Sequence, residues 1–279
     1  MRRRTVVTAL AAALVPLAIA ATTAAATDTS STATGAAAPH AAKPSTHRLI
    51  PAPGQGVLPR RNATVTSSNW SGYAVVTSGV TEVRSTFVVP TLKTFPTGFA
   101  STWAGIGGYN TSDLIQAGMA EESPNEYYAW YEILPASATR IFNCVGDASC
   151  SVRPGDKAYV RIYQKRGNIW NITIGNTGHG VHWTWVRDIV YASSRSSAEW
   201  VLEAPTVGGV QSTLANVGTA YFGPTNVYKA NGVLRRIAGG NPVQIVLVQN
   251  GIRAARPSPL ASDGQRFNDC SYQRNCRAP

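Results

Sequence analysis

Charged residues are scarce in this sequence. Asp, Glu, Lys and Arg make up 14% of the 279 residues, and only 14 residues are acidic. So little charge does not suit long exposed helices or a coiled coil, while a hydrophobic content of 44% is too high for a disordered chain. After the N-terminus, no apolar run approaches the roughly 18 residues of a membrane-spanning helix. We therefore expect a globular protein and not an integral membrane protein.

The net charge of +11 does not indicate nucleic-acid binding, because much of it lies near the N-terminus. Seven of the 25 basic residues precede residue 62, against one acidic residue, Asp28. The remaining 18 basic and 13 acidic residues leave +5. These basic residues are scattered and form no stripe or known nucleic-acid-binding module. We expect no nucleic-acid partner.

The N-terminus has the three parts of a secretory signal peptide. Met1-Arg2-Arg3-Arg4 is positively charged, residues 5–21 are apolar, and Ala24-Ala25-Ala26 offers a small-residue cleavage site. A membrane anchor is the alternative, but the apolar stretch is short for one. We predict that residues 1–26 are removed and that the protein is secreted, extracellular and free of the membrane.

Residues 27–61 are predicted to be a disordered linker or a propeptide. They are rich in Ala, Thr, Ser and Pro and show no apolar periodicity, so they cannot bury enough surface to offset the entropy cost of ordering. Arg60-Arg61 near the end is either a processing site or an incidental pair. The folded domain is expected to span residues 62–279.

Only four cysteines are present, and their spacing favours disulfides. Cys144 and Cys150 are six residues apart, as are Cys270 and Cys276. The sequence has no C-x2-C pair, and neither histidine of residues 62–279 lies near a cysteine, so we expect no zinc site. Two local disulfides, Cys144–Cys150 and Cys270–Cys276, are the simplest of three possible pairings.

The body of the chain alternates apolar and polar residues with a period of two. In residues 157–164, Ala158, Val160 and Ile162 share one face, and Arg166-Gly167-Asn168 then forms a tight turn into another alternating run. No convincing helix of ten residues is visible. About a dozen strands are expected, including 69–76, 82–89, 101–107, 113–119, 127–134, 157–164, 169–174, 182–189, 198–203 and 243–249. This pattern predicts an all-β protein with an antiparallel β-sandwich.

The usual catalytic motifs are missing. The sequence has no G-x-S-x-G, no H-E-x-x-H and no phosphate-binding loop, and the cysteines are expected to be paired. His179 and His182 flank a tryptophan-rich strand, where a structural or exposed role is the simpler interpretation. Acids and amides within apolar strands therefore stand out, because burying them is costly unless they are hydrogen-bonded. They are Gln116, Glu132, Glu199 and Glu203.

Two of these acids lie on one strand. Glu199 and Glu203 point to the same side, about 13 Å apart at ~3.3 Å per residue, so they cannot form a direct carboxylate pair. Trp200 and Leu202 point to the other side, towards a core. One sheet face thus carries Gln, Glu and Trp side chains, either as the lining of a groove or as ordinary solvent-facing residues.

Six segments, taken in order, carry a resemblance to a known family. They are Ser68-Asn69-Trp70-Ser71-Gly72-Tyr73, Val83-Arg84-Ser85-Thr86-Phe87-Val88-Val89-Pro90, Thr102-Trp103-Ala104-Gly105-Ile106-Gly107, Leu114-Ile115-Gln116-Ala117-Gly118, Ala129-Trp130-Tyr131-Glu132-Ile133-Leu134-Pro135 and Ala198-Glu199-Trp200-Val201-Leu202-Glu203. Their order resembles that of the glutamic peptidases, or eqolisins, over residues 68 to about 250. The resemblance implies a sandwich of two curved antiparallel sheets, lectin-like in architecture, with the active site on the concave sheet.

The resemblance also assigns roles. It implies that Gln116 and Glu203 are catalytic and that Trp103, Trp130 and Glu132 line the substrate groove. We expect Gln116 and Glu203 to project from neighbouring strands and to share one water molecule. The sequence departs from the family pattern at Gly107, Ala120 and Ala204-Pro205, where well-known members carry aspartates. These departures put in question a strongly acidic pH optimum more than the reaction itself.

The implied function is a secreted endopeptidase. It would use a glutamate–glutamine dyad and an activated water, with no metal, no cofactor and no covalent intermediate, and would act on polypeptides as a monomer. Two alternatives remain open. One is a carbohydrate-binding module, since lectin-like sandwiches with exposed tryptophans commonly bind sugars. The other is an inactive peptidase homologue.

Overall fold

The structure is a computed structural model that describes residues 45–48, 50 and 63–279. The predicted signal peptide and most of the predicted linker, including Arg60-Arg61, lie outside the described residues. The elements, in chain order, are β1 (Ser45–Thr46), β2 (Thr64–Ser67), β3 (Trp70–Val76), β4 (Val80–Val88), β5 (Phe99–Gly107), β6 (Leu114–Glu122), β7 (Glu126–Ile133), β8 (Thr139–Arg140), β9 (Lys157–Arg166), β10 (Ile169–Gly178), β11 (Val181–Val190), β12 (Ser197–Glu203), β13 (Thr206–Val207), β14 (Val210–Gln211), β15 (Thr219–Ala230), β16 (Val233–Arg236), the 3-10 helix η1 (Ile237–Gly240), β17 (Val243–Gln249), β18 (Ile252–Pro257) and β19 (Phe267–Ser271).

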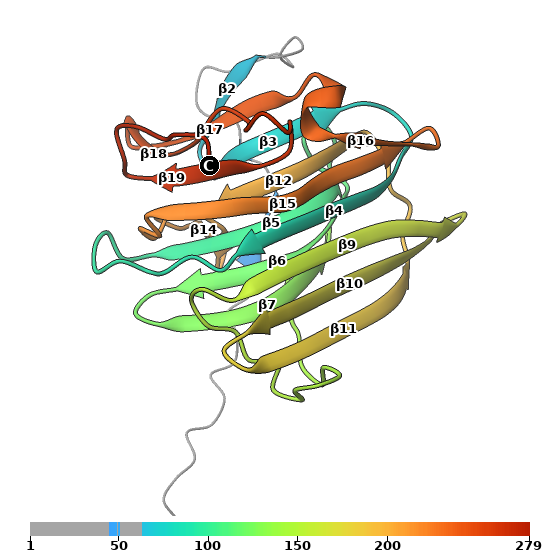
Figure 1. Cartoon of the computed structure of the whole chain (residues 1–279), viewed down its shortest axis with the longest axis horizontal. Coiled ribbons are helices and arrows are strands. Elements are labelled where there is room, and N and C mark those ends of the chain that lie inside the picture. Colours follow the sequence, from blue (N-terminus) through green and yellow to red (C-terminus); the bar gives the residue numbers. More distant parts are fainter. Residues whose placement is uncertain (1–44, 49, 51–62) are drawn as a thin grey trace, which may run out of the picture. The chain divides into compact units, whose positions relative to one another are not determined.

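The long strands form two layers (Figure 1). One layer has the order β11-β10-β9-β4-β15, and the other has the order β17-β3-β12-β5-β6-β7-β8, with β19 and β18 joining them at one end. Neighbouring strands are antiparallel in both layers, and the described exception among the named strands is β2, which pairs in parallel with β17. The predicted all-β sandwich is confirmed.

The main core fills the space between these layers. Val83 and Phe87 of β4, Ile162 of β9, and Trp200 and Leu202 of β12 belong to it, and each is at most 1% exposed. Trp200 and Leu202 therefore face the core, as their alternation with Glu199 and Glu203 predicts. The same alternation turns the two glutamates to the opposite face of their layer, where the candidate site lies.

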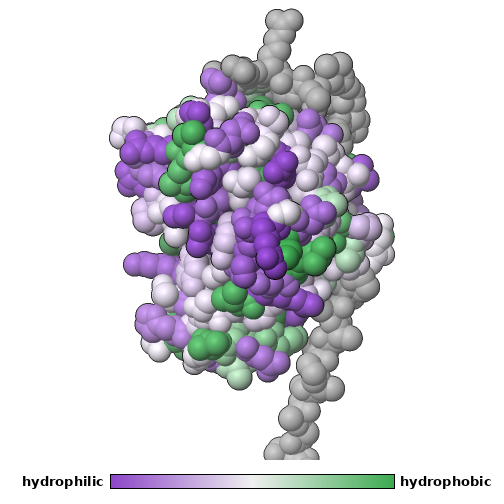
Figure 2. Space-filling view, turned by 90° about the vertical axis from the view of Figure 1, so that its right-hand side faces the viewer, coloured by the Kyte–Doolittle hydropathy of each residue, from purple (hydrophilic) through white to green (hydrophobic). Residues whose placement is uncertain are grey.

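Both predicted disulfides are present, Cys144–Cys150 and Cys270–Cys276. Each closes a short loop at the periphery, so each stabilises the fold less than a long-range bridge would. Among the described residues, no helix has the length and apolar character needed to span a bilayer. Figure 2 shows one face of the molecule, where hydrophobic residues form small separate groups among hydrophilic ones.

Candidate active site

The candidate site is built on four neighbouring strands, β12, β5, β6 and β7. Residues directly opposite one another in an antiparallel ladder point to the same face. Glu203 of β12 lies opposite Ser101 of β5, and Ser101 lies opposite Ala120 of β6. Gln116 is four residues from Ala120 on β6, an even number, so it points to the same face. Gln116 in turn lies opposite Glu132. The ladder therefore places Gln116, Glu132 and Glu203 on one face.

The expectation that Gln116 and Glu203 come from neighbouring strands is wrong. Strand β5 lies between β6 and β12, because the chain order of the strands is not their order in the sheet. The register also places Glu199, rather than Glu203, level with Gln116, with Gly105 between them. The sequence pattern gives the face of each residue but neither the strand order nor the level along the strand.

Glu203 is fully buried and held by a side chain from β5 and one from the bend between β2 and β3. Its Oε1 accepts a hydrogen bond from Asn69 Nδ2 at 2.9 Å, and its Oε2 accepts one from Trp103 Nε1 at 2.8 Å. Trp103 was predicted to line the groove, and here its indole N–H orients the predicted catalytic carboxyl. Because both oxygens have fixed donors, the carboxyl group has a defined position.

Gln116 and Glu132 form a second buried pair. Gln116 Nε2 donates to Glu132 Oε2 at 2.5 Å, and both residues are fully buried. Among the described residues, Gln116 Oε1 and Glu132 Oε1 have no hydrogen-bond partner. A buried polar atom without a partner is costly and needs an explanation, such as a water or a substrate group that it is placed to contact.

His47 connects these two groups. Its Nδ1 lies 2.9 Å from Glu203 Oε2, and its backbone N–H donates to Glu132 Oε2 at 3.0 Å. Its ring stacks on Trp130, with 3.8 Å between ring centroids and 9° between planes. The hydrogen bonds thus run from Gln116 through Glu132 and His47 to Glu203. Gln116 and Glu203 belong to one cluster, with the His47 side chain at the Glu203 end.

Gly118 lies between the two tryptophans of the predicted groove, opposite Trp103 on one side and Trp130 on the other. A Cβ at this position would be 2.4 Å from Trp103 Cβ and 2.4 Å from the carbonyl oxygen of Thr102. We expect Gly118→Ala to lower the free energy of unfolding by about 1–3 kcal/mol through overpacking. Urea denaturation of both proteins tests this, and equal midpoints would contradict it.

Burial dominates the electrostatics of the site. It raises the pKa of Glu203 and of Glu199 well above the ordinary value, because removal from water disfavours the charged form. The pKa of Glu132 is raised to about 7, first by burial and further by the nearby Glu203. Burial lowers the pKa of His47 to about 4, against the pull of Glu132. Burial therefore favours the neutral form of both His47 and Glu203.

The buried carboxyls predict that the fold is more stable in acid. Burial raises the pKa of Glu121, Glu199, Glu203 and Asp269 well above the value of an unfolded chain. Above pH ~4.5 the native state therefore binds more protons than the unfolded state, and stability falls as pH rises, by up to about 1.4 kcal/mol per pH unit for each carboxyl. Urea midpoints, followed by tryptophan fluorescence, should fall between pH 4.5 and 7.

A matched variant makes this prediction specific. Glu121 lies on the opposite face of β6 from Gln116, so Glu121→Gln removes one buried acid away from the site. In this variant the free energy of unfolding should fall less steeply as pH rises, because the native state binds one proton fewer than in the wild type. Glu82 has the opposite effect on the pH dependence of stability. Hydrogen bonds from Arg84 and Arg161 lower its pKa despite its partial burial. Midpoints that rise steadily from pH 4.5 to 7 would contradict the account.

Sequence reasoning missed three residues of the site: Asn69, Trp70 and His47. Asn69 and Trp70 are in the S-N-W segment, which was noted only as a motif, although an asparagine before a buried tryptophan is a signal for a satisfied polar contact. Trp70 Nε1 donates to the carbonyl of His47 at 3.1 Å. His47 lies in the segment predicted to be linker, and no local pattern marks it.

The two histidines that the sequence analysis set aside, His179 and His182, lie outside the candidate site. His179 Nδ1 contacts Asp156 Oδ1 at 2.5 Å, and His182 is exposed, as expected of residues outside the site. Among the described residues, no group of three or more His, Cys, Asp or Glu side chains is arranged to hold a metal ion.

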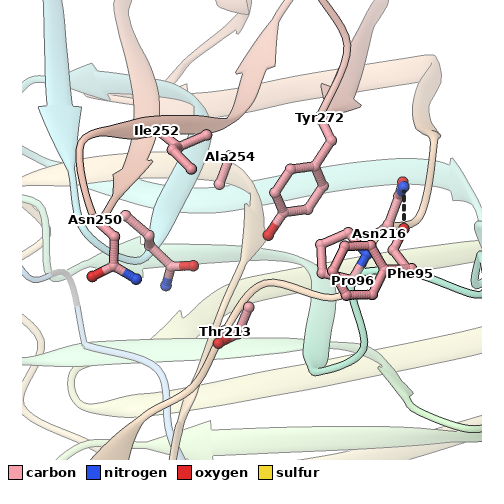
Figure 3. Close-up of a pocket in the computed structure, with 9 residues that line it drawn as sticks. Phe95, Pro96, Thr213, Asn216, Asn250, Ile252, Ala254 and Tyr272 are labelled. Carbon is pink, nitrogen blue, oxygen red and sulfur yellow. Dashed lines mark hydrogen bonds between the residues drawn. The ribbon is translucent and has the colours of Figure 1, made fainter.

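Two of the surface cavities in the described part of the chain, each of about 490 Å³, differ in their relation to this cluster. One adjoins it and is lined by Thr46 and Arg48 together with Asp113, Leu134, Pro135 and Tyr191. The other is lined by Phe95, Thr213, Ile252 and Tyr272 among others, without an acidic or basic side chain (Figure 3). The second cavity is lined by no Asp, Glu, His, Lys or Arg side chain and includes none of the predicted site residues.

Comparison with known proteins identifies the family of this chain. A model described as the Peptidase A4 family matches residues 68–263, which include all of Gln116, Glu132 and Glu203. The chain belongs to the Peptidase A4 family. These are the glutamic peptidases, or eqolisins, so the resemblance inferred from the six segments is confirmed.

Individual A4 relatives agree with this assignment. The chain is 25% identical over 192 residues to aspergillopepsin-2 of Aspergillus niger, an alignment that covers 60% of this chain and 65% of that relative's length. In structure it resembles scytalido-glutamic peptidase crystallised with a transition-state analogue inhibitor, with a TM-score of 0.60, 17% identity, and coverage of 73% of this chain and 98% of the other. It also resembles SCP-B, an eqolisin in complex with the tripeptide Ala-Ile-His, with a TM-score of 0.56, 16% identity and the same coverage. At these identities, the two structures support the A4 fold.

Proposed function

We propose that this protein is a secreted endopeptidase that hydrolyses polypeptides with Glu203 and Gln116. The observation that carries the proposal is the cluster of Glu203, Gln116 and Glu132 on one sheet face, in a chain of the A4 family. The structural relatives bear on it too, since one was crystallised with a transition-state analogue and another with a tripeptide. The two disulfides are typical of a protein outside the reducing cytosol.

Glu203 is the general base of the proposed reaction. Its ionised carboxylate takes a proton from a water molecule, which attacks the carbonyl carbon of the scissile bond, and later returns that proton to the leaving amine. Asn69 and Trp103 hold the carboxyl group at both oxygens. The burial that raises the pKa of Glu203 makes it a stronger base once ionised and a competent acid afterwards.

Gln116 stabilises the oxyanion. Its amide N–H, now donated to Glu132, can turn to the negative charge that develops on the carbonyl oxygen, and its Oε1 has no partner among the described residues and can orient the attacking water. Glu132 positions the amide in the resting state. In this scheme water attacks directly, so the dyad needs neither a covalent intermediate nor a metal.

Glu199 is the competing choice for the general base, because the register places it level with Gln116. Two observations favour Glu203. Glu203 is hydrogen-bonded to both Asn69 and Trp103, and it is connected to Gln116 through His47 and Glu132. Among the described residues, neither oxygen of the buried Glu199 has a hydrogen-bond partner that would orient it.

The test of the proposed function is digestion of denatured casein by the purified protein across pH, with pepstatin present and absent. Peptide products should appear and pepstatin should not suppress them, since the proposed site has no pair of catalytic aspartates. A preparation of Glu203→Gln made in parallel detects contaminating proteases. Absence of products at every pH would contradict the proposal.

The carbohydrate-binding alternative has little support in the structure. Six of the seven tryptophans are at most 2% exposed, and the seventh, Trp185, is only half-buried. Sugar binding on lectin-like sandwiches usually uses an exposed aromatic platform. Sugar binding that survives Glu203→Gln, together with no peptide cleavage, would nevertheless favour this alternative.

A further inference from the structure

We propose that the outer face of the layer β11-β10-β9-β4-β15 (Figure 1) binds an acidic polysaccharide in a groove lined by Tyr159, Tyr221 and Lys157, here called the tyrosine groove. The groove lies on the side of the sandwich away from the candidate active site, whose residues project from the outer face of the other layer. The proposal therefore goes beyond the proposed peptidase function and does not depend on it.

The ring of Tyr159 forms one side of the tyrosine groove. Ala158 and Val160 face the main core, so Tyr159, which alternates with them on β9, faces outward and is partly exposed. It lies opposite Gly175 of β10, which lies opposite Thr184 of β11. The Tyr159 hydroxyl is 2.9 Å from Thr184 Oγ1, and a Cβ at Gly175 would be 2.2 Å from Tyr159 Cε1. The ring therefore lies flat across Gly175, with its other face turned away from the sheet.

An irregular stretch of β15 forms the other side. The pairing of β15 with β4 is interrupted after Phe222, and Tyr221 and Pro224 line the groove here. The amide of Thr225 donates to Thr86 Oγ1 of β4 at 2.8 Å, which holds this stretch to the sheet where the ladder is broken. The groove has a volume of about 490 Å³, which is a usual size for a ligand pocket. Its two sides are thus fixed in place by the fold.

The position of the tyrosine groove favours a sugar over an extended peptide. A peptide that adds a strand needs an unpaired sheet edge, but β4, β9 and β10 each have a partner strand on both sides. A sugar ring has an apolar C–H face that stacks on an aromatic ring, and hydroxyl groups at its rim. The tryptophans offer no such platform, whereas Tyr159 does. Sugar binding here would accompany the peptidase function and not replace it.

The charges around the groove favour an acidic sugar. Lys157 lines the groove, is exposed, and forms no ion pair within the described part of the chain, and no Asp or Glu lines the groove. The next outward-facing pair along β4 and β9 is Arg84 and Arg161, which both donate to Glu82 Oε1, at 2.7 and 2.6 Å. This face thus has an excess of positive charge, which complements a carboxylate on the ligand.

The test is isothermal titration calorimetry on the full chain that follows signal-peptide removal, with polygalacturonate and alginate as probes. Two matched probes separate the contributions of ring and charge. Polygalacturonate whose carboxyl groups have been reduced to alcohols keeps the rings without the charge, and poly-D-glutamate has the charge without the rings. We expect at least one uronate polymer to bind at least about tenfold more tightly than either matched probe.

Variants locate the binding in the tyrosine groove. Tyr159→Ala and Lys157→Gln should each weaken binding of the uronate polymer by about tenfold. Tyr163→Ala and Lys165→Gln are the matched controls, since both residues are on β9 but outside the groove. The ring of Tyr163 is already covered by a guanidinium group, and Lys165 already pairs with a carboxylate. Both controls should bind like the wild type, and urea midpoints confirm that each variant is folded.

Several results would overturn the proposal. They are no binding of either uronate polymer, equal affinity for the reduced polymer, and equal affinity for poly-D-glutamate, which would indicate an acidic peptide as the ligand. Equal losses in Lys157→Gln and Lys165→Gln would indicate general attraction to a basic protein and would also overturn it. Casein digestion tests the peptidase function separately, and Tyr159→Ala should digest casein at the rate of the wild type.

Discussion

Replacing Glu203 with glutamine is expected to abolish peptide hydrolysis, a loss of about 10²–10⁴-fold or more in kcat/KM, with the fold intact. The amide has nearly the volume of the carboxyl group but cannot accept the proton of the attacking water. The rates are measured in a His47→Ala background, because the His47 side chain lies 2.9 Å from Glu203 Oε2, where the attacking water would bind. Circular dichroism and the urea midpoint confirm that the variant is folded.

Glu199→Gln is the matched control for this prediction. Glu199 is on the same strand and the same face, is equally buried, and also has a pKa raised by burial. It contacts neither Trp103 nor Asn69 through its carboxyl oxygens, so we expect a much milder loss. Similar losses in the two variants, or activity kept in Glu203→Gln, would show that Glu203 is not the general base.

Replacing Gln116 with alanine is expected to lower kcat by about 10²–10³-fold, the usual cost of removing one oxyanion donor. KM should change less, because the donor acts mainly on charge that develops in the transition state. Kinetics on a single peptide substrate measure the two parameters separately. A change confined to KM would place Gln116 in substrate binding and remove it from the catalytic step.

Gln116→Ala also removes the hydrogen bond that Glu132 accepts from Gln116. A second variant separates this loss from the loss of the oxyanion donor. Glu132→Gln keeps a hydrogen-bonding side chain opposite Gln116 but removes the acid whose pKa is raised to about 7. If Glu132 only positions the amide of Gln116, the variant should keep most of kcat and lose a pH-dependent step near 7. A loss as large as that of Gln116→Ala would give Glu132 a direct part in the reaction.

Much of the fold follows from a period of two along the chain. The alternation in residues 157–164 places apolar side chains in the core and polar ones outside, and β9 has this pattern. The alternation in residues 198–203 separates the two faces of β12 in the same way, but both faces are buried, with the glutamates on the side of the candidate site. Some strands were not among the expected runs, and the longest of these is β15, in which Gly223-Pro224 interrupts the alternation. In the structure the pairing of β15 with β4 breaks between Phe222 and Asn226, so the proline lies at an irregularity and takes no place in the ladder.

The site was predictable in part. Burial cost singled out Gln116, Glu132, Glu199 and Glu203, because few acids are present and these residues lie in apolar strands. The choice of Glu203 over Glu199 came from the family resemblance. The order of strands in the sheet was not predictable, since β5, β6 and β12 are brought together from distant parts of the chain. The position of His47 could not be predicted, for a different reason. Its position depends on contacts with residues 23 to 156 positions away, and the surrounding Ala, Thr, Ser and Pro give no local signal.

The most direct test of the dyad is a crystal structure of the His47→Ala chain at a resolution that shows ordered water. The account predicts that one water molecule lies within about 3.2 Å of both the Glu203 carboxyl group and the Gln116 amide, in the place that the imidazole vacates. A structure in which Gln116 and Glu203 share no water, or in which Gln116 shares one with Glu199 instead, would contradict it.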